Sequence, residues 1–221
     1  MKQYRVIAAL IAFTVTFAFF LTTGIFQNVG RSPHIQLVNP SRSQQEMMDM
    51  LARAGKDFLI FDYHLDDQIQ HMEVWVEIYH YGELIARRGG ISVRAGEQPI
   101  GSGQFMLLRD QGLHFSAPQD FQWTFFTEFG TFQDERWSRE EDTPLSRGWG
   151  PITAPQPIQD GQEIVLHATR FAAGSLRTFY DLQMYLEPEN REDITYLHLI
   201  VARFSSFLEV KYRYLPDTSG G

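Results

Sequence analysis

The first part of the chain contains one uninterrupted apolar stretch. Residues 6–26 include no charged side chain, and Val, Ile, Leu, Phe and Ala dominate among them. At about 1.5 Å of rise per residue, a helix of this length spans the roughly 30 Å hydrocarbon core of a bilayer. Lys2 and Arg5 precede the stretch, and the next charge is Arg31. Because positive flanks stay in the cytoplasm, the pattern predicts a transmembrane anchor with residues 1–5 inside and the rest outside.

A cleaved signal peptide is the alternative interpretation of this stretch. Signal peptides have an apolar core of about 7 to 15 residues and a small-x-small cleavage site. Here the apolar run is longer, and the best resemblance to a cleavage site is Thr22-Thr23-Gly24. The chain has no cysteine, which excludes a lipid-modified N-terminal cysteine. We therefore expect a signal-anchor: a single-pass protein of the cell membrane with its C-terminal domain outside the cytoplasm.

Residues 27–56 are predicted to form a stalk and one short helix. Residues 30–40 carry proline and polar side chains without periodicity, which indicates the stalk. Ser43 and Glu46 have the spacing of a capping box, in which each side chain satisfies a free backbone N–H group. An apolar face and a capping glycine follow at helical spacing: Met47, Met48, Leu51, Ala54 and Gly55. We expect this membrane-proximal helix to pack on the domain, or to offer its methionines to a partner.

From residue 58 onward the period of the pattern changes to two. Residues 72–79 alternate between apolar and mixed side chains, and Tyr81-Gly82-Glu83 indicates the turn of a hairpin. Further strands are predicted at residues 105–108, 113–115, 121–129, 163–170, 179–186, 195–204 and 208–215. Many short strands without helical patterns between them predict an all-β fold, an antiparallel β-sandwich over residues 57–216 with a flexible tail at 217–221.

One segment interrupts the strand pattern. Residues 133–161 show no sustained period and contain four prolines. A loop of that length inside a compact domain is uncommon and is either functional or disordered. We therefore predict a long loop here and treat its side chains as candidates for binding.

Charge excludes one class of partner. Two of the 19 basic residues and none of the 27 acidic residues lie in the anchor segment, so the outer part has 17 minus 27, or −10, formal charges. Such a domain repels phosphate backbones, which argues against nucleic-acid binding. The lack of cysteine also means that the outer domain is stabilised by its core, without disulfides.

No motif for catalysis, cofactor binding or metal binding stands out. The seven histidines are scattered and lack the spacing of a helical or strand metal site. Ser102 lies in Gly101-Ser102-Gly103, which reads better as a hairpin turn than as a nucleophile. Asp66-Asp67 and Glu140-Glu141-Asp142 read as solvated turns, since glycosidase chemistry needs two carboxylates across a cleft. We expect no catalytic, cofactor-binding or metal-binding residues, and no cofactor.

Aromatic side chains are the best candidates for contact with a partner. Trp75, Tyr79 and Tyr81 share one strand face with Glu77, and rings with polar neighbours stack on sugars or bury against proteins. The alternative is that the short helix or the long loop covers this face. In the long loop, Trp137 and Trp149 either anchor a partner or pin the loop onto the sandwich.

Several strand sequences look familiar together. They are Phe61-Asp62-Tyr63, Val74-Trp75-Val76-Glu77-Ile78-Tyr79 with Gly82-Glu83-Leu84, and Ile164-Val165-Leu166-His167-Ala168. In these strings the chain resembles uncharacterised extracytoplasmic lipoproteins and membrane-anchored β-sandwich proteins of Gram-positive bacteria, although it lacks the cysteine of the lipoproteins. The resemblance covers about residues 58–169. It implies an extracytoplasmic sandwich and no particular activity.

These patterns together predict a non-enzymatic binding or scaffold module of the cell envelope. Its expected partners are the membrane, through the N-terminal helix, and either a neighbouring membrane protein or a wall glycan. Two alternatives stay open: a hydrolase of cell-wall polymers that gathers carboxylates from several strands, and an accessory subunit of a transporter or sensor.

Overall fold

The computed structural model describes residues 32–95, 100–110, 122–127, 130–133, 145–174 and 181–206. The chain divides into two compact units, residues 1–31 and residues 32–221, and everything described belongs to the second. In it, β-strands form two sheets in which every strand pairing is antiparallel. The predicted all-β class is therefore confirmed for the part of the chain that the structure describes.

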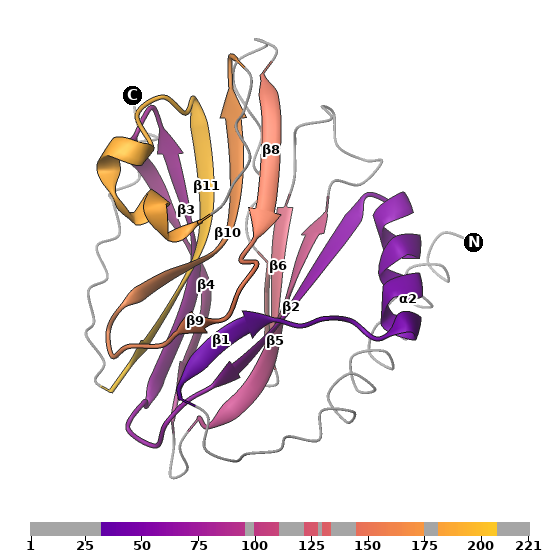
Figure 1. The fold of residues 1–221 in the computed structure, drawn as a ribbon, viewed down its shortest axis with the longest axis vertical. Helices are drawn as coiled ribbons and strands as arrows, with labels where there is room; N and C mark the ends of the chain where they lie inside the picture. The colour runs from indigo at the N-terminus through magenta and orange to yellow at the C-terminus, as the bar shows by residue number, and fades with distance from the viewer. Residues whose placement is uncertain are drawn as a thin grey trace. The chain divides into compact units, whose positions relative to one another are not determined.

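The two sheets differ in strand order (Figure 1). Sheet A has the order β7-β6-β5-β2-β1-β9, and sheet B has the order β4-β3-β11-β10-β8. The strands of sheet A are β1 (His34–Leu37), β2 (Lys56–His64), β5 (Ser102–Asp110), β6 (Gln122–Thr127), β7 (Gly130–Gln133) and β9 (Gln156–Pro157). Those of sheet B are β3 (His71–His80), β4 (Glu83–Arg94), β8 (Ser146–Pro151), β10 (Glu163–Ala172) and β11 (Tyr196–Ser205).

The hydrophobic core lies between the two sheets. Alternate residues of β3 face it, and Met72, Val74, Val76 and Ile78 are almost completely buried, as the period-two pattern predicts. Aromatic side chains cross from one sheet to the other. The ring centroids of Tyr63 on β2 and Phe204 on β11 lie 6.0 Å apart. One core cluster joins both sheets, so the described strands form a β-sandwich.

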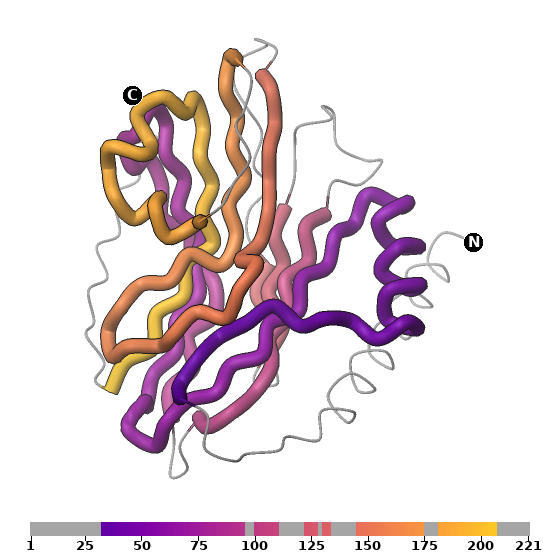
Figure 2. The backbone as a smooth tube through the Cα atoms, viewed as in Figure 1, coloured from indigo at the N-terminus to yellow at the C-terminus, as the bar shows by residue number. Residues whose placement is uncertain are grey.

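Sheet B is buried on its outer face as well. Residues 181–194 form two short 3₁₀ helices, η1 (Gln183–Leu186) and η2 (Pro188–Asn190), and the tube in Figure 2 shows this segment folding back beside the strands. The side-chain amide of Gln183 bonds to both backbone groups of Val165 on β10, at 2.9 Å each. Leu182 and Tyr185 in the same segment are buried. The prediction of a strand at 179–186 is therefore wrong: residues 181–186 cover a sheet instead of extending it.

The soluble helix is confirmed, with a different cap. Helix α2 (Arg42–Arg53) begins after Ser41, whose hydroxyl accepts the N–H of Gln44 while the Gln44 side chain accepts the N–H of Ser41. The capping box is therefore Ser41 with Gln44, not Ser43 with Glu46, because Ser41 takes the extended backbone that an N-cap requires. Gly55 follows the helix end with φ of +76°, as a capping glycine does. Met47, Met48 and Leu51 lie on its half-buried face.

Two other predictions need correction. The stalk at residues 30–40 contains β1, which pairs with β2 along its whole length and so belongs to the sandwich. The long loop at 133–161 is not irregular throughout, because β8 and β9 lie within it. β8 pairs with β10 at six positions although its sequence, Ser-Arg-Gly-Trp-Gly-Pro, lacks alternation. A strand at a sheet edge tolerates glycine and proline that an interior strand would not.

Several predicted features lie outside the described residues. These are the anchor at 6–26, the strands at 113–115 and 208–215, the tail at 217–221, Phe121, Phe129 and the loop portion at 134–144. The anchor therefore stays a prediction. Among the helices that the structure does describe, none has the length and apolar character needed to cross a membrane.

A pair of glycines permits a close approach of β3 and β4. Gly89 and Gly90 of β4 together lie opposite the single residue Trp75 of β3. This two-to-one pairing is a β-bulge in the hairpin. A Cβ atom on Gly90 would lie 1.8 Å from the carbonyl oxygen of Val74, so backbone would have to move to admit it. At Gly150 on β8, an added Cβ would meet no heavy atom within 4 Å.

We expect Gly90→Ala to destabilise the protein by about 1 to 3 kcal/mol, as overpacking of a well-packed site does. Gly150→Ala is the matched control and should change the free energy of unfolding by less than about 0.5 kcal/mol. Chemical denaturation of the full chain in detergent micelles measures both. Equal stability of the two variants would show that β3 and β4 do not approach as described.

Candidate functional site

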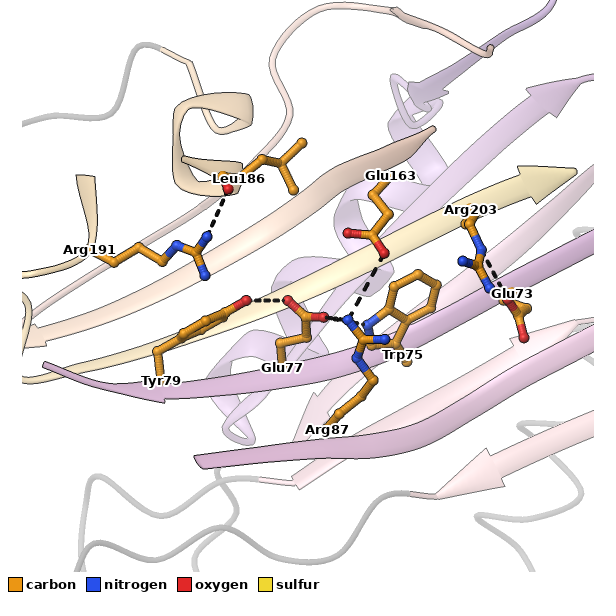
Figure 3. A network of polar contacts seen from close by, with 9 residues as sticks. All are labelled: Glu73, Trp75, Glu77, Tyr79, Arg87, Glu163, Leu186, Arg191 and Arg203. Carbon is orange, nitrogen blue, oxygen red and sulfur yellow. Dashed lines mark hydrogen bonds and ion pairs between the residues drawn. The ribbon is translucent and has the colours of Figure 1, made fainter. Parts of the chain in front are cut away.

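The outer face of sheet B carries a buried carboxylate on β3. Glu77 on β3 is only 2% exposed. Its oxygens accept hydrogen bonds from the indole N–H of Trp75 at 3.0 Å and from the hydroxyl of Tyr79 at 2.6 Å. The guanidinium of Arg87 on β4 donates a third bond and forms an ion pair with it (Figure 3). Three donors therefore satisfy a charge that would otherwise be costly to bury.

Arginines also cover the two rings beside Glu77. The guanidinium carbon of Arg87 lies 5.1 Å from the centroid of the Trp75 ring. That of Arg191 lies 4.3 Å from the Tyr79 ring, and Arg191 is held in place by a 2.7 Å bond to the carbonyl oxygen of Leu186 in η1. Figure 3 shows Arg191 and Leu186 on the segment that packs over the strands. Cation–π contacts of this kind fix the rings in one orientation.

A second ion pair extends the network along the sheet. Arg203 on β11 bonds to Glu73 on β3 at 2.5 Å, and its guanidinium carbon lies 5.7 Å from the Trp75 ring. Glu163 on β10 lies 4.0 Å from the Arg87 guanidinium. Burial, and then repulsion from Glu77, raise the pKa of the Glu163 carboxyl, while Arg87 opposes the shift. Burial is also the first cause that raises the pKa of Tyr79, followed by Glu77.

Three of the candidate partner-binding residues therefore sit inside one hydrogen-bonded network. Trp75, Glu77 and Tyr79 are each less than 10% exposed, and Trp75 and Tyr79 both hydrogen-bond to Glu77. Among the described residues, the cover of this face consists of residues 181–194 and Arg87, and not of the short helix. The network holds β3, β4 and the 181–194 segment together.

Tyr81, the fourth candidate on this strand, lies at the tip of the β3–β4 hairpin. Tyr81 and Gly82 have φ of +47° and +80°, the positive values of a type I′ turn. Tyr81 is 56% exposed, and Leu84 and Ile85 just beyond the turn are 37% and 50% exposed. We call these three residues the hairpin patch. The backbone of Glu192 lies close to Gly82, because a Cβ atom on Gly82 would be 3.4 Å from its Cα.

The two tryptophans assigned to the long loop have different outcomes. Trp137 lies outside the described residues. Trp149 lies on β8, where it is 46% exposed. The guanidinium carbon of Arg109 on β5 is 4.3 Å from the Trp149 ring, and the His167 ring on β10 is 6.1 Å away at 22°. Trp149 is thus held by the sandwich and also presented at its surface.

The arginines around Glu77 and the arginine beside Trp149 were not identified from the sequence. Arg87 is the clearest case. A two-residue turn at Tyr81-Gly82 would place Ala86 opposite Glu77, but a β-bulge between the partners of Ile78 and Tyr79 shifts the register and brings Arg87 there. Opposite charges on neighbouring strands can predict a cross-strand ion pair such as Glu77 with Arg87. The sequence does not show the bulge that brings these two residues opposite each other.

The histidines and Ser102 show one pairing that the sequence did not predict. Ser102 begins β5, after Gly101 with φ of +66°, and its hydroxyl hydrogen-bonds to the Nδ1 atom of His64 on β2. His34 on β1 lies near His64, with ring centroids 6.1 Å apart. Within the described ranges, no group of three or more His, Cys, Asp or Glu side chains is arranged to hold a metal ion.

We expect Glu77→Gln to destabilise the protein by about 1.5 to 3 kcal/mol, the range for hydrogen bonds to charged groups. The lower end applies because Arg87 is 39% exposed and solvent screens its share. Glu46→Gln is the matched control, since Glu46 forms an exposed i,i+4 pair with Arg42 on α2, and it should leave stability unchanged within error. Urea denaturation in detergent micelles measures both, and equal effects would contradict a structural role for Glu77.

Comparison with known proteins adds no assignment. No protein-family profile, curated protein sequence or solved structure matches the chain. The resemblance to membrane-anchored proteins of Gram-positive bacteria stays a prediction.

Proposed function

We propose that the chain is a non-enzymatic binding or scaffold module of the cell envelope, held at the outer face of the cytoplasmic membrane by residues 6–26. In this proposal the sandwich docks a partner protein through the hairpin patch. The apolar N-terminal run and its positive flank support the membrane placement. The exposure of Tyr81, Leu84 and Ile85 supports the docking role.

The clustering of exposed apolar side chains in the hairpin patch is the observation that supports the docking role. Six large apolar side chains are exposed among the described residues, and three of them lie within five positions of the chain, at the tip of one hairpin. Scattered exposed apolar residues are normal on a protein surface, whereas a gathered set indicates an interaction site. Tyrosine is also enriched at protein interfaces, because it buries a large ring and still hydrogen-bonds.

The charges around the patch indicate the chemistry of the partner. Glu83 in the hairpin and Glu192 beside Gly82 are exposed, and Asp193 follows Glu192. An apolar centre with an acidic rim complements a partner surface that is apolar and basic. A protein is favoured over a neutral glycan here because acidic side chains attract basic side chains of a partner. They give no such attraction to an uncharged sugar.

The network around Glu77 supports the role by making the hairpin rigid. Tyr79 precedes the turn by two residues and is fixed by Glu77 and by Arg191. The N–H group of Tyr81 bonds to the carbonyl oxygen of Thr195 at 3.2 Å, which ties the turn to the start of β11. A binding surface that is already ordered loses less entropy when a partner docks.

Site-specific photo-cross-linking tests the proposal in cells that produce the protein. A photoreactive phenylalanine analogue at position 81 should capture one membrane protein through an apolar and basic segment. The same probe at position 50 on α2, where Met50 is 65% exposed, is the matched control and should not capture it. Glu83→Lys with Glu192→Lys should reduce the capture at position 81 severalfold, because the rim then repels a basic partner.

Two outcomes would contradict the docking role. One is capture of the same proteins from positions 81 and 50, which would indicate random encounter. The other is capture that charge reversal of Glu83 and Glu192 leaves unchanged. Thermal unfolding of the charge-reversed chain confirms that the sandwich is intact before capture is compared.

A further inference from the structure

Strand β4 is an exposed edge of sheet B. It ends the strand order on one side, and within the described residues it pairs with β3 alone. Most of its side chains over Glu83–Arg94 are exposed or half-buried, whereas most of those on β3 are buried. Exposed edge strands are places where a second chain pairs or packs. This edge therefore offers a surface to a partner that approaches sheet B from the side.

The accessible part of this edge is short. A Cβ atom on Gly89 would lie 3.5 Å from the ring of Phe132 on β7, so β4 approaches sheet A from that residue on. Before it, Ile85 is the extra residue of the β-bulge between the partners of Tyr79 and Ile78, and it is 50% exposed. A bulge discourages regular pairing with an arbitrary strand. Recognition at this edge therefore depends on side chains.

The side chains at the accessible part of the edge are self-complementary. An acid, three apolar residues and a base follow one another there: Glu83, Leu84, Ile85, Ala86 and Arg87. Glu83 is exposed, and the side chain of Arg87 is 39% exposed although it also pairs with Glu77. When two such segments lie antiparallel, the acid of each meets the base of the other. The apolar residues then meet in the middle, with Ile85 at the two-fold axis.

Neighbouring residues extend the same separation of charge. Glu192 lies beside Gly82 at the tip of the hairpin and is exposed, as is Asp193. The three arginines of β4 lie farther from the tip, at positions 87, 88 and 94, and no acidic residue of the strand follows Glu83. An antiparallel second copy places acidic ends beside basic ends, whereas a parallel copy would place like charges together.

We propose that the partner of the hairpin patch is a second copy of this chain, with the two β4 strands antiparallel and the two Ile85 side chains in contact. The inference rests on the docking role proposed above. The apolar and basic segment expected of the partner is then residues 84–87 of the second copy. Because the contact is small, we expect it to be weak in solution and to be favoured when both copies are confined to one membrane.

The lack of cysteine in the chain makes disulfide formation a direct test. Ile85→Cys places one thiol of each copy at the two-fold axis, and copper phenanthroline in air oxidises the two thiols to a disulfide. Ser92→Cys is the matched control, since Ser92 is an exposed residue of the same strand. The antiparallel arrangement separates its two copies by roughly 40 Å, far beyond the Cα separation of about 7 Å that a disulfide spans.

The full chain is oxidised in the membranes of cells that produce it and analysed by non-reducing electrophoresis. We expect a covalent dimer from Ile85→Cys and chiefly monomer from Ser92→Cys. Equal dimer formation by the two variants would overturn the proposal, because random encounter would explain it. Absence of a dimer from Ile85→Cys would overturn it as well.

Charge reversal tests the ionic part of the contact. In the Ile85→Cys chain, Glu83→Arg should reduce the disulfide-linked fraction severalfold, because position 83 then faces Arg87 of the second copy with like charge. Glu46→Arg on α2 changes the net charge by the same amount at an exposed site and should leave the fraction unchanged. Thermal unfolding checks that each variant is folded. An undiminished dimer in the Glu83→Arg chain would overturn the proposal.

Photo-cross-linking at position 81 separates this inference from the docking role on which it rests. A second copy as partner requires that the captured protein be this chain itself. Capture of a different protein, together with no disulfide at position 85, would overturn the second copy and retain the docking role. Capture of nothing at position 81, together with no disulfide at position 85, would overturn both.

Discussion

The requirement to satisfy one buried carboxylate organises the outer face of sheet B. Glu77 is almost completely buried on that face, where an unpaired charge would cost several kcal/mol. Trp75, Tyr79 and Arg87 meet this requirement together, and each takes a fixed position as a result. Arg191 then packs on Tyr79 and brings the segment before β11 over the sheet. One polar interaction thereby links two strands and a covering segment.

This closed face determines which surfaces stay available to partners. Trp75, Glu77 and Tyr79, which form a candidate docking row in the sequence, are buried, and among the described residues the large exposed aromatic side chains are those of Tyr81 and Trp149. The hairpin patch continues from the end of β3, where Tyr79 is held. Trp149 lies on β8 and is supported by a second buried ion pair, between Arg109 and Asp57. In both places a buried charge orients an aromatic residue near or at the surface.

The period-two pattern accounts for much of the fold, and its failures have local causes. The strands at 72–79, 163–170 and 195–204 are long and either alternate or are rich in apolar residues, and their prediction is confirmed. Strand β8 was not predicted because glycine and proline interrupt its pattern. Strand β1 was not predicted because four residues are too few to show a period. The network around Glu77 was harder to predict, because Arg87 lies opposite Glu77 only as a result of a β-bulge. No pattern in the sequence indicated that bulge.

A double-mutant cycle of Glu77→Gln and Arg87→Gln tests the dependence of sheet B on this pair most directly. Arg87→Gln alone leaves the Glu77 carboxylate buried without its cation, and adding Glu77→Gln removes that charge. The free energies of unfolding should therefore be coupled by about 1 kcal/mol or more, with the double variant less destabilised than the sum of the single ones. Strict additivity would contradict the account, because Glu77 would then be stable without Arg87.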